Sequence, residues 1–234
     1  MNNNIYLALD FHSYLEADQF LTQHDLGGVP VKVGMELFYK EGPDCIKRLR
    51  DKGHDVFLDL KLHDIPTTVY KAMKNIASLD VQMTNVHALG SKEMMIRAKE
   101  GLVEGSHAGD VPYLVAVTLL TSHDQHTVNQ QLRMPDTIEA TVTHLASLAK
   151  QGSADGVVCS VHEVSNIKAA CGQDFLTVTP GIRIENTSLD DQKRVATPGL
   201  AKEKGSDYLV IGRSITESSD PKERYNQAIK EWSK

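Results

Sequence analysis

A short apolar strand pattern followed by a helical pattern recurs eight times along the chain. Most of the strand segments are β-branched and apolar at successive positions, as in a parallel sheet covered by helices. The expected strands are Ile5–Asp10, Val29–Gly34, Asp55–Leu60, Val81–Val86, Tyr113–Thr118, Gly156–Ser160, Leu176–Pro180 and Tyr208–Gly212. Eight such units predict an α/β fold, a (β/α)8 TIM barrel with residues 1–234 as a single domain. An open doubly wound sheet is the alternative, but no G-x-G-x-x-G follows the first strand.

Residues that favour helix starts lie between the expected strands. Helices are predicted to begin at or just after Ser13, Pro43, Ser91 and Asp220, because such residues cap or open a first turn. Asp136 with Glu139 forms a capping-box pattern, which predicts a helix over Ala140–Lys150.

Composition narrows the possible partners and locations. With a net charge of −6 and a pI near 5.9, nucleic acid and anionic membranes are not expected as obligatory partners. The start MNNNIYLALD lacks the regions of a signal peptide, and no apolar run is long enough to span a membrane. The three cysteines show no C-x-x-C spacing, so we expect reduced, buried thiols in a cytoplasmic protein and no zinc site.

The segment DLKLHDIP at 59–66 places charges at the end of an otherwise apolar strand. Side chains alternate along a strand, so Asp59 and Lys61 should share one face. A salt-bridged strand end is the simplest interpretation of an isolated D-x-K. However, burying such a pair usually costs more in desolvation than the attraction returns. With a third charge at Asp64, the segment favours a functional site.

Polar residues also collect at the carboxyl ends of the other expected strands. They are Asp10, Lys32, His87, Thr121, Ser122, Arg183 and Arg213. Active sites of (β/α)8 barrels lie at this end. Scattered surface charges would not sort in this way, so the pattern predicts an enzyme.

The last two strands lead into a predicted phosphate site. The seventh runs into TPGIR at 179–183 and the eighth into IGRS at 211–214. Barrels often bind phosphate here, and Gly181 and Gly212 permit close backbone approach while Arg183 and Arg213 match phosphate oxygens. The long polar connection from Gly181 to Gly205 resembles a closing loop.

These segments together resemble the orotidine 5′-phosphate decarboxylase family. The matching pieces are Asp10, Lys32, DLKLHDIPTT at 59–68, NVHALG at 85–90, LTS at 120–122, TPGIR at 179–183, DQKR at 191–194 and IGRSI at 211–215. D-x-K-x-x-D alone also occurs in related sugar-phosphate enzymes, but its combination with the later segments is specific. One departure is Asp190, where many relatives have glycine.

The resemblance implies a role for each matching residue. Lys61 would be the proton donor, Asp59 its charged neighbour beside the departing carboxylate, and Lys32 the lysine that completes the network. Asp64 would cross a homodimer interface into the partner's active site. The implied substrate-binding residues are Asp10, Lys32, Asp59, Ile65, Thr68, Thr121, Pro180, Arg183, Gln192, Gly212 and Arg213. The substrate would be orotidine 5′-monophosphate and the product UMP, with no cofactor and no metal.

Two other functions stay open at this point. One is a magnesium-dependent relative on the same barrel, such as 3-keto-gulonate-6-phosphate decarboxylase or hexulose phosphate synthase, against which TPGIR and DQKR argue. The other is a non-catalytic nucleotide-binding barrel, which would be expected to lose Lys61. His63 and His87 are interpreted as structural, and His123 with His126 as a surface loop.

Overall fold

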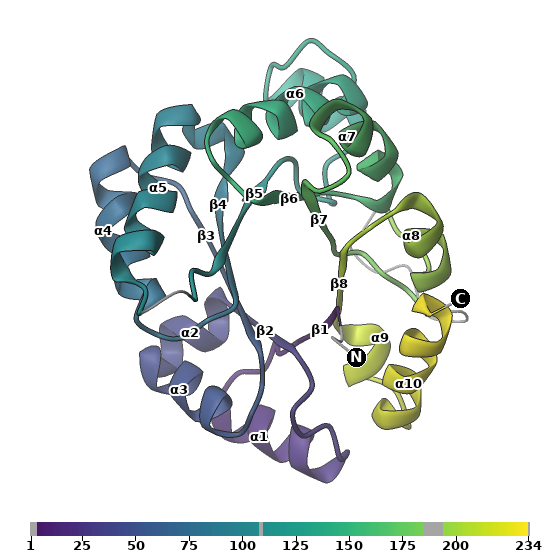
Figure 1. The fold of residues 1–234 in the computed structure, drawn as a ribbon. Helices are drawn as coiled ribbons and strands as arrows, with labels where there is room; N and C mark the ends of the chain where they lie inside the picture. Colours follow the sequence, from purple (N-terminus) through teal and green to yellow (C-terminus); the bar gives the residue numbers. More distant parts are fainter. Residues whose placement is uncertain (1–3, 108–109, 185–193, 234) are drawn as a thin grey trace.

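The computed structural model describes residues 4–107, 110–184 and 194–233. Its centre is a closed barrel in which neighbouring strands are parallel and follow chain order (Figure 1). The strands are β1 Ile5–Ala8, β2 Val31–Gly34, β3 Val56–Leu62, β4 Met83–His87, β5 Tyr113–Val117, β6 Gly156–Val158, β7 Leu176–Thr179 and β8 Tyr208–Ile211. Each overlaps an expected strand, and closure through β1 and β8 excludes the open sheet.

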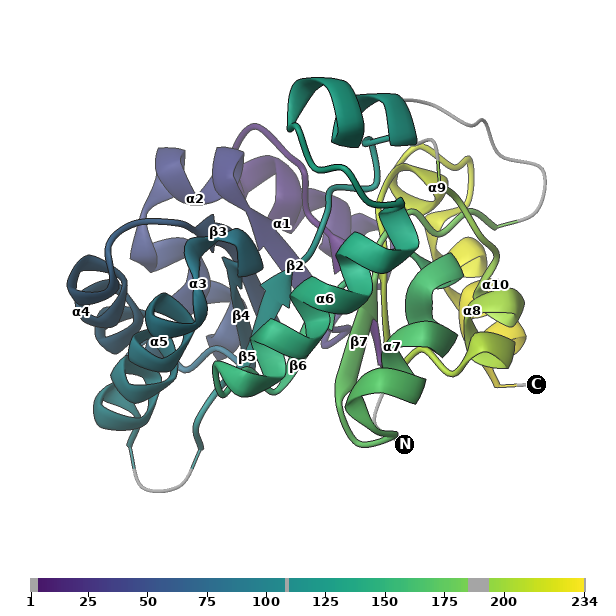
Figure 2. The same cartoon turned by 90° about the horizontal axis from the view of Figure 1, so that it is seen from above.

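Helices form a layer around this barrel, as Figures 1 and 2 show. They are α1 Tyr14–Gln23, α2 Met35–Glu41, α3 Pro43–Asp51, α4 Pro66–Ala77, α5 Lys92–Gly105, α6 Ile138–Gln151, α7 Val164–Cys171, α8 Pro198–Lys204, α9 Arg213–Thr216 and α10 Pro221–Trp232. Short turns of other helix types are η1 Ala88–Gly90, η2 Thr127–Gln131 and η3 Val161–Glu163.

The helix starts follow the predicted capping residues with one exception. The side chains of Ser13, Ser91 and Asp220 each accept a hydrogen bond from a backbone N–H of the first turn. The prediction that Asp136 caps the sixth helix is wrong. Thr137 accepts from the N–H of Ala140 instead, and the Asp136 carbonyl is held by side chains of the preceding loop. The capping residue is therefore one position later than predicted, and the helix spans Ile138–Gln151.

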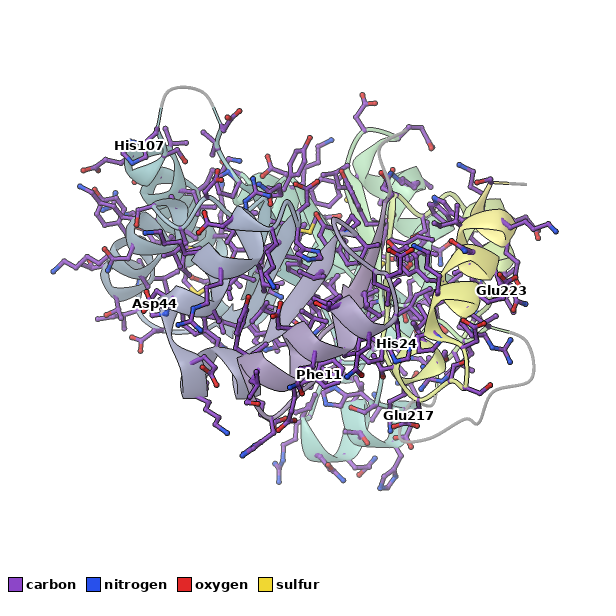
Figure 3. The ribbon with its side chains drawn as sticks, turned by 90° about the horizontal axis from the view of Figure 1, so that it is seen from below. Phe11, His24, Asp44, His107, Glu217 and Glu223 are labelled. Carbon is purple, nitrogen blue, oxygen red and sulfur yellow. The ribbon has the colours of Figure 1, made fainter. Side chains whose placement is uncertain are left out.

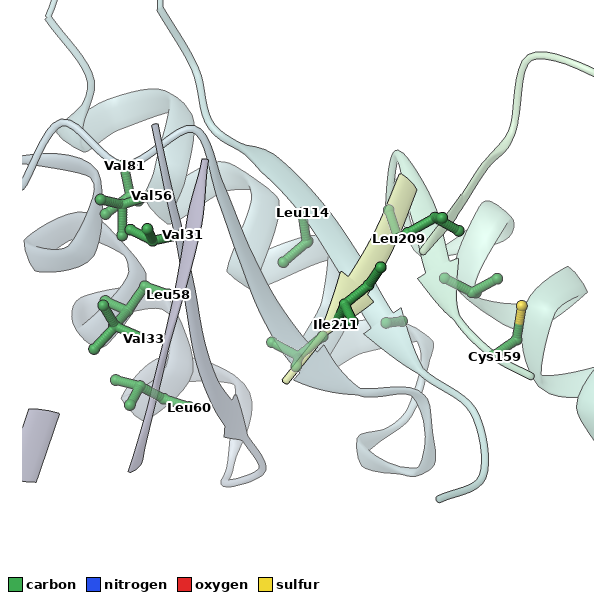
Figure 4. Packing of buried hydrophobic residues seen from close by; sticks show 14 of the residues in the cluster. Val31, Val33, Val56, Leu58, Leu60, Val81, Leu114, Cys159, Leu209 and Ile211 are labelled. Carbon is green, nitrogen blue, oxygen red and sulfur yellow. The ribbon is translucent and has the colours of Figure 1, made fainter. Parts of the chain in front are cut away.

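The alternation of strand side chains creates two separate apolar regions. Val31, Val33, Val56 and Leu58 point outward and pack between barrel and helices (Figure 4). A second cluster fills part of the barrel interior, with Tyr6, Ala8, Phe57, Met83, Val115, Val178 and Val210. The inward positions beyond this cluster, toward the carboxyl ends of β2 and β3, hold charged side chains. The barrel interior is therefore apolar at one end and ionic at the other.

Charged side chains lie on the outer surface of the helix layer. Asp44 on α3 and Glu223 on α10 are exposed on it (Figure 3). Over residues 4–107, 110–184 and 194–233, no helix combines the length and apolar character that crossing a membrane requires.

Candidate active site

A cavity of about 300 Å³ opens at the carboxyl ends of the strands. Its lining contains most of the residues that the sequence predicts to bind substrate or take part in catalysis: Asp10, Lys32, Asp59, Lys61, Thr121, Pro180, Arg183, Gly212 and Arg213. They come from strands on all sides of the barrel. Parallel strands bring them together because their carboxyl ends meet at one face.

Three charged side chains from β2 and β3 form a connected array on one side of this cavity. The Lys61 Nζ lies 2.6 Å from Asp59 Oδ1, and the Lys32 Nζ lies 3.3 Å from Asp59 Oδ2. Lys32 also contacts Asp10, with 3.3 Å between Nζ and Oδ1. Both oxygens of the Asp59 carboxylate therefore face an ammonium group. The predicted proximity of Asp59 and Lys61 is confirmed.

Lys32 and Asp59 keep their charges although they are buried. Lys32 and Asp59 are 9% and 8% exposed. Burial acts to raise the pKa of Asp59, but the ammonium groups of Lys32 and Lys61 together outweigh it and hold that pKa below its ordinary value. For Lys32, burial acts to lower the pKa, and the carboxylates of Asp59 and Asp10 reverse the shift. Asp59 and Lys32 are therefore ionised at neutral pH.

The backbone at Lys61 leaves the regular strand conformation. Its φ is +52°, in the left-handed region, and the pairing register between β3 and β4 shifts between Leu58 and Leu62. A non-glycine residue held there costs on the order of 1–2 kcal/mol. Strand alternation predicted the face of Lys61 correctly but not this conformation. A strained backbone at a charged residue facing a cavity is typical of an active site.

Asn85 on β4 is the residue that the sequence interpretation missed. It belongs to the matched segment NVHALG, but no role followed from the segment alone. Its side-chain Oδ1 accepts from the Lys61 backbone N–H at 2.7 Å, and its Nδ2 donates to Asp59 Oδ1 at 2.6 Å. The alternation of strand side chains was the available signal. Asn85 is two residues after Met83, which points into the barrel, so both side chains lie on the inner face.

The opposite side of the cavity carries the predicted phosphate-binding residues. Gly181 has φ +77°, a conformation that glycine adopts without strain. The Arg183 N–H donates to the Ala196 carbonyl at 2.8 Å, so this segment is paired with the returning chain. Arg213 begins α9, with Gly212 as its N-cap. Guanidinium groups beside a helix start suit an anionic ligand.

Arg194, the last residue of DQKR, joins this returning chain to the rest of the cavity rim. It forms an ion pair with the buried Glu163 of η3. Its Nη2 donates to the Leu120 carbonyl at 3.1 Å, next to Thr121 in the lining. The sequence interpretation quoted this arginine without a role.

Four predicted ligand residues are not in this lining. Asp64, Ile65 and Thr68 are exposed, and the Asp64 carboxylate accepts from the Ile65 N–H at 2.7 Å. The segment turns away from its own barrel's cavity into helix α4. Gln192 lies outside the described residues, as does Asp190.

Two histidines, His63 and His87, lie near the array. The His63 and His87 rings lie 5.7 Å apart. Burial, together with His63 and Lys61, lowers the pKa of His87, so it is neutral at neutral pH. Among the described residues, no group of three or more His, Cys, Asp or Glu side chains is arranged to hold a metal ion.

A buried ionic array facing a cavity at this end of a (β/α)8 barrel defines the class: the protein is a barrel enzyme. A protein named orotidine 5′-phosphate decarboxylase from Bacillus cytotoxicus is 49% identical over 233 residues, which cover 99% of this chain and 98% of that protein. The chain belongs to the orotidine 5′-phosphate decarboxylase / HUMPS family, whose model matches residues 3–228.

Solved structures agree with this membership. Orotidine 5′-phosphate decarboxylase from Lactobacillus acidophilus is 43% identical with a TM-score of 0.88, and the match covers 100% of both chains. A conserved protein from Geobacillus kaustophilus is 44% identical with a TM-score of 0.86, covering 97% of this chain and 99% of that one. The matches run through the whole barrel.

Proposed function

We propose that the protein is a carboxy-lyase that converts orotidine 5′-monophosphate to UMP, the last step of de novo pyrimidine nucleotide synthesis. It acts as a single domain over residues 1–234, with no metal and no cofactor. The observation that carries the proposal is the Lys32–Asp59–Lys61 array, which faces the same cavity as Arg183 and Arg213. Family membership supports it.

The array suits the charge changes of this decarboxylation. Cleavage of the bond between the pyrimidine ring and its carboxylate leaves the electron pair on the ring carbon and releases carbon dioxide. The Lys61 ammonium stabilises that carbanion and then transfers a proton to it. Lys61 recovers its proton from solvent, so the reaction consumes one proton.

Asp59 has two roles in this proposal. Its contact with Lys61 at 2.6 Å holds the ammonium group in place. It also lies beside the substrate carboxylate, where repulsion between the two anions ends as carbon dioxide leaves. Asp10 and Lys32 bind the ribose, and Thr121 contacts the pyrimidine ring.

The phosphate group of the substrate binds at the other side of the cavity. Arg183, Gly212 and Arg213 surround it, with Pro180 beside them and Gln192 from the long connection. Because this group is remote from the reacting carbon, its binding free energy can contribute to catalysis by positioning the ring.

The test is a spectrophotometric assay that follows loss of orotidine monophosphate absorbance. Wild-type protein should turn over without added cofactor. Lys61→Ala should lose kcat/KM by on the order of 10⁴-fold or more, since it removes both charge stabilisation and the proton. Undiminished turnover by Lys61→Ala would contradict the assignment of the proton donor. Turnover of orotidine monophosphate should be unchanged in EDTA, and loss of activity there would favour a magnesium-dependent enzyme.

A second copy of the chain would complete the active site. Exposed apolar side chains follow β2, β3 and β4 in succession: Met35 at 44%, Tyr39 at 70%, Ile65 at 67% and Leu89 at 41% exposure. Large exposed apolar residues gathered at one end of a fold favour an interface. Asp64, Ile65 and Thr68 lie in this region, so they reach the partner's cavity in a homodimer.

Mixing two inactive variants tests the shared site. In a Lys61→Ala and Asp64→Ala heterodimer, one site has both substitutions and the other has neither. Random mixing should restore about a quarter of wild-type activity, since half the dimers are mixed and each has one intact site. No recovery after verified exchange of subunits would contradict sharing. The proposal places the enzyme in the cytoplasm, acting on a small molecule without nucleic acid or membrane as partner.

A further inference from the structure

The side-chain carboxamide of Asn85 forms hydrogen bonds with both Lys61 and Asp59. It contacts the backbone of Lys61 and the carboxylate of Asp59, over 2.7 and 2.6 Å. Asn85 is 1% exposed and does not line the cavity. Any influence on the reaction therefore passes through its neighbours.

The amide can adopt only one orientation. The Lys61 N–H needs an acceptor and the Asp59 carboxylate needs a donor. Rotating the amide by half a turn would place its oxygen against the carboxylate and its NH2 against the N–H. Of the side chains close in size, asparagine supplies one acceptor and one donor in this arrangement without taking up a proton, which aspartate would have to do.

These contacts stabilise both the backbone conformation of Lys61 and the carboxylate that holds its ammonium group. One bond satisfies the N–H of a residue with φ +52°. The other fixes Asp59 Oδ1, which is also the oxygen that holds the Lys61 Nζ. The Asn85 carboxamide therefore positions the backbone of Lys61 directly and its ammonium group through Asp59.

We propose that Asn85 is a positioning residue that sets the direction of the Lys61 ammonium group for proton transfer. The inference rests on the function proposed above. It assigns Asn85 no contact with the substrate. Its loss should therefore lower kcat, while binding of a phosphorylated nucleotide stays unchanged.

Asn85→Leu provides the first test, with Thr84→Val as matched control. Thr84 precedes Asn85 on β4, is fully buried, and donates its hydroxyl to a backbone carbonyl, that of Leu58, at 3.0 Å, rather than to a charged side chain of the array. Misplacement of a reacting group by about 1 Å costs about 100-fold, so kcat of Asn85→Leu should fall by about that factor. Its dissociation constant for UMP should stay within about threefold, and Thr84→Val should retain kcat within about threefold at equal folded fraction.

Asn85→Asp provides a readout that a merely structural role would not move. An ionised Asp at this position repels Asp59, whereas the protonated acid again offers one acceptor and one donor. The groups facing it are Asp59 and Lys61 of β3, Lys32 of β2 through Asp59, and His87 of its own strand. Its partner on β5, Val115, is apolar. The kcat/KM of Asn85→Asp relative to wild type should rise as the pH falls.

Each outcome decides a different point. Equal losses of kcat in Asn85→Leu and Thr84→Val, a weakened UMP affinity that accounts for the loss, or a ratio for Asn85→Asp that is flat with pH would each overturn the positioning role. Absence of turnover by the wild type would instead overturn the proposed function, and this inference with it.

Discussion

Two buried lysine–aspartate clusters lie at opposite ends of the barrel strands. The Lys168 ammonium group on α7 is surrounded by the carbonyls of Gln173 and Phe175 and by Asp207 Oδ2, at 2.8, 3.0 and 2.7 Å. Asp207 also accepts from the N–H and hydroxyl of Thr177. All three donors of Lys168 thus have protein partners.

The Lys61 cluster differs in what its donors contact. Within the part of the chain that the structure describes, the Lys61 Nζ contacts one carboxylate, Asp59, and its other donors face the cavity. Buried charge alone therefore does not identify an active site. A cluster whose hydrogen-bonding capacity is filled by protein stabilises the fold, and one with capacity left toward a cavity can act on a ligand.

The largest expected difference between the clusters is in activity. Lys61→Met should lower kcat/KM by on the order of 10⁴-fold or more, and Lys168→Met should leave it within about threefold at equal folded fraction. The check is the orotidine monophosphate assay on both variants below their melting temperatures. A comparable loss of activity in Lys168→Met would break the comparison.

For stability we expect the larger effect from the substitution of Lys168 and the smaller one from that of Lys61. Lys168→Met leaves Asp207 without its ammonium partner and should lower the free energy of unfolding by about 3 kcal/mol. Lys61→Met removes a group that is 25% exposed, and should cost about 1 kcal/mol or less. Urea denaturation of both variants measures the difference, and equal losses would contradict it.

A similar comparison for ligand binding is between Arg213, which lines the cavity, and Arg50, which does not. Arg213→Met should raise the dissociation constant for UMP by about 30-fold, because it removes charge-assisted hydrogen bonds to phosphate. Arg50→Met is the matched control, since Arg50 pairs with Asp55 and Asp80 away from the cavity. Isothermal titration should show unchanged affinity in this control; a similar weakening would argue against a phosphate site at Arg213.

The smallest effect concerns pH. The pKa of Asp59 in the folded protein lies below the ordinary value of 3.8, so its ionisation contributes stability above that pH. The contribution should be lost as pH falls through the lower folded pKa. The free energy of unfolding of wild type relative to Asp59→Asn should be constant from about pH 5 to 8 and fall in stronger acid. An unchanged difference in acid would place the folded pKa at its ordinary value.

Much of the architecture was accessible from local patterns. Strand runs such as Val29–Gly34 and helix caps such as Ser13 and Ser91 depend on near neighbours in the chain, so their patterns predicted the elements closely. The shared face of Asp59 and Lys61 followed from the two-residue period of a strand. The position of the cavity followed from the barrel, because all carboxyl ends meet there.

Other features depend on contacts between distant segments. Asn85 reaches Lys61 only because β4 lies beside β3 with a shifted register, and the third partner of Lys168 is Asp207, directly before the start of β8.

Local sequence therefore determined the order of the elements and the residues that face the barrel interior, because alternation and capping act over a few residues. Tertiary structure alone decided which buried charges are left open to the cavity. Whether a buried charge stays open depends on how many hydrogen-bond donors and acceptors surround it, and some of these come from segments far apart in the chain.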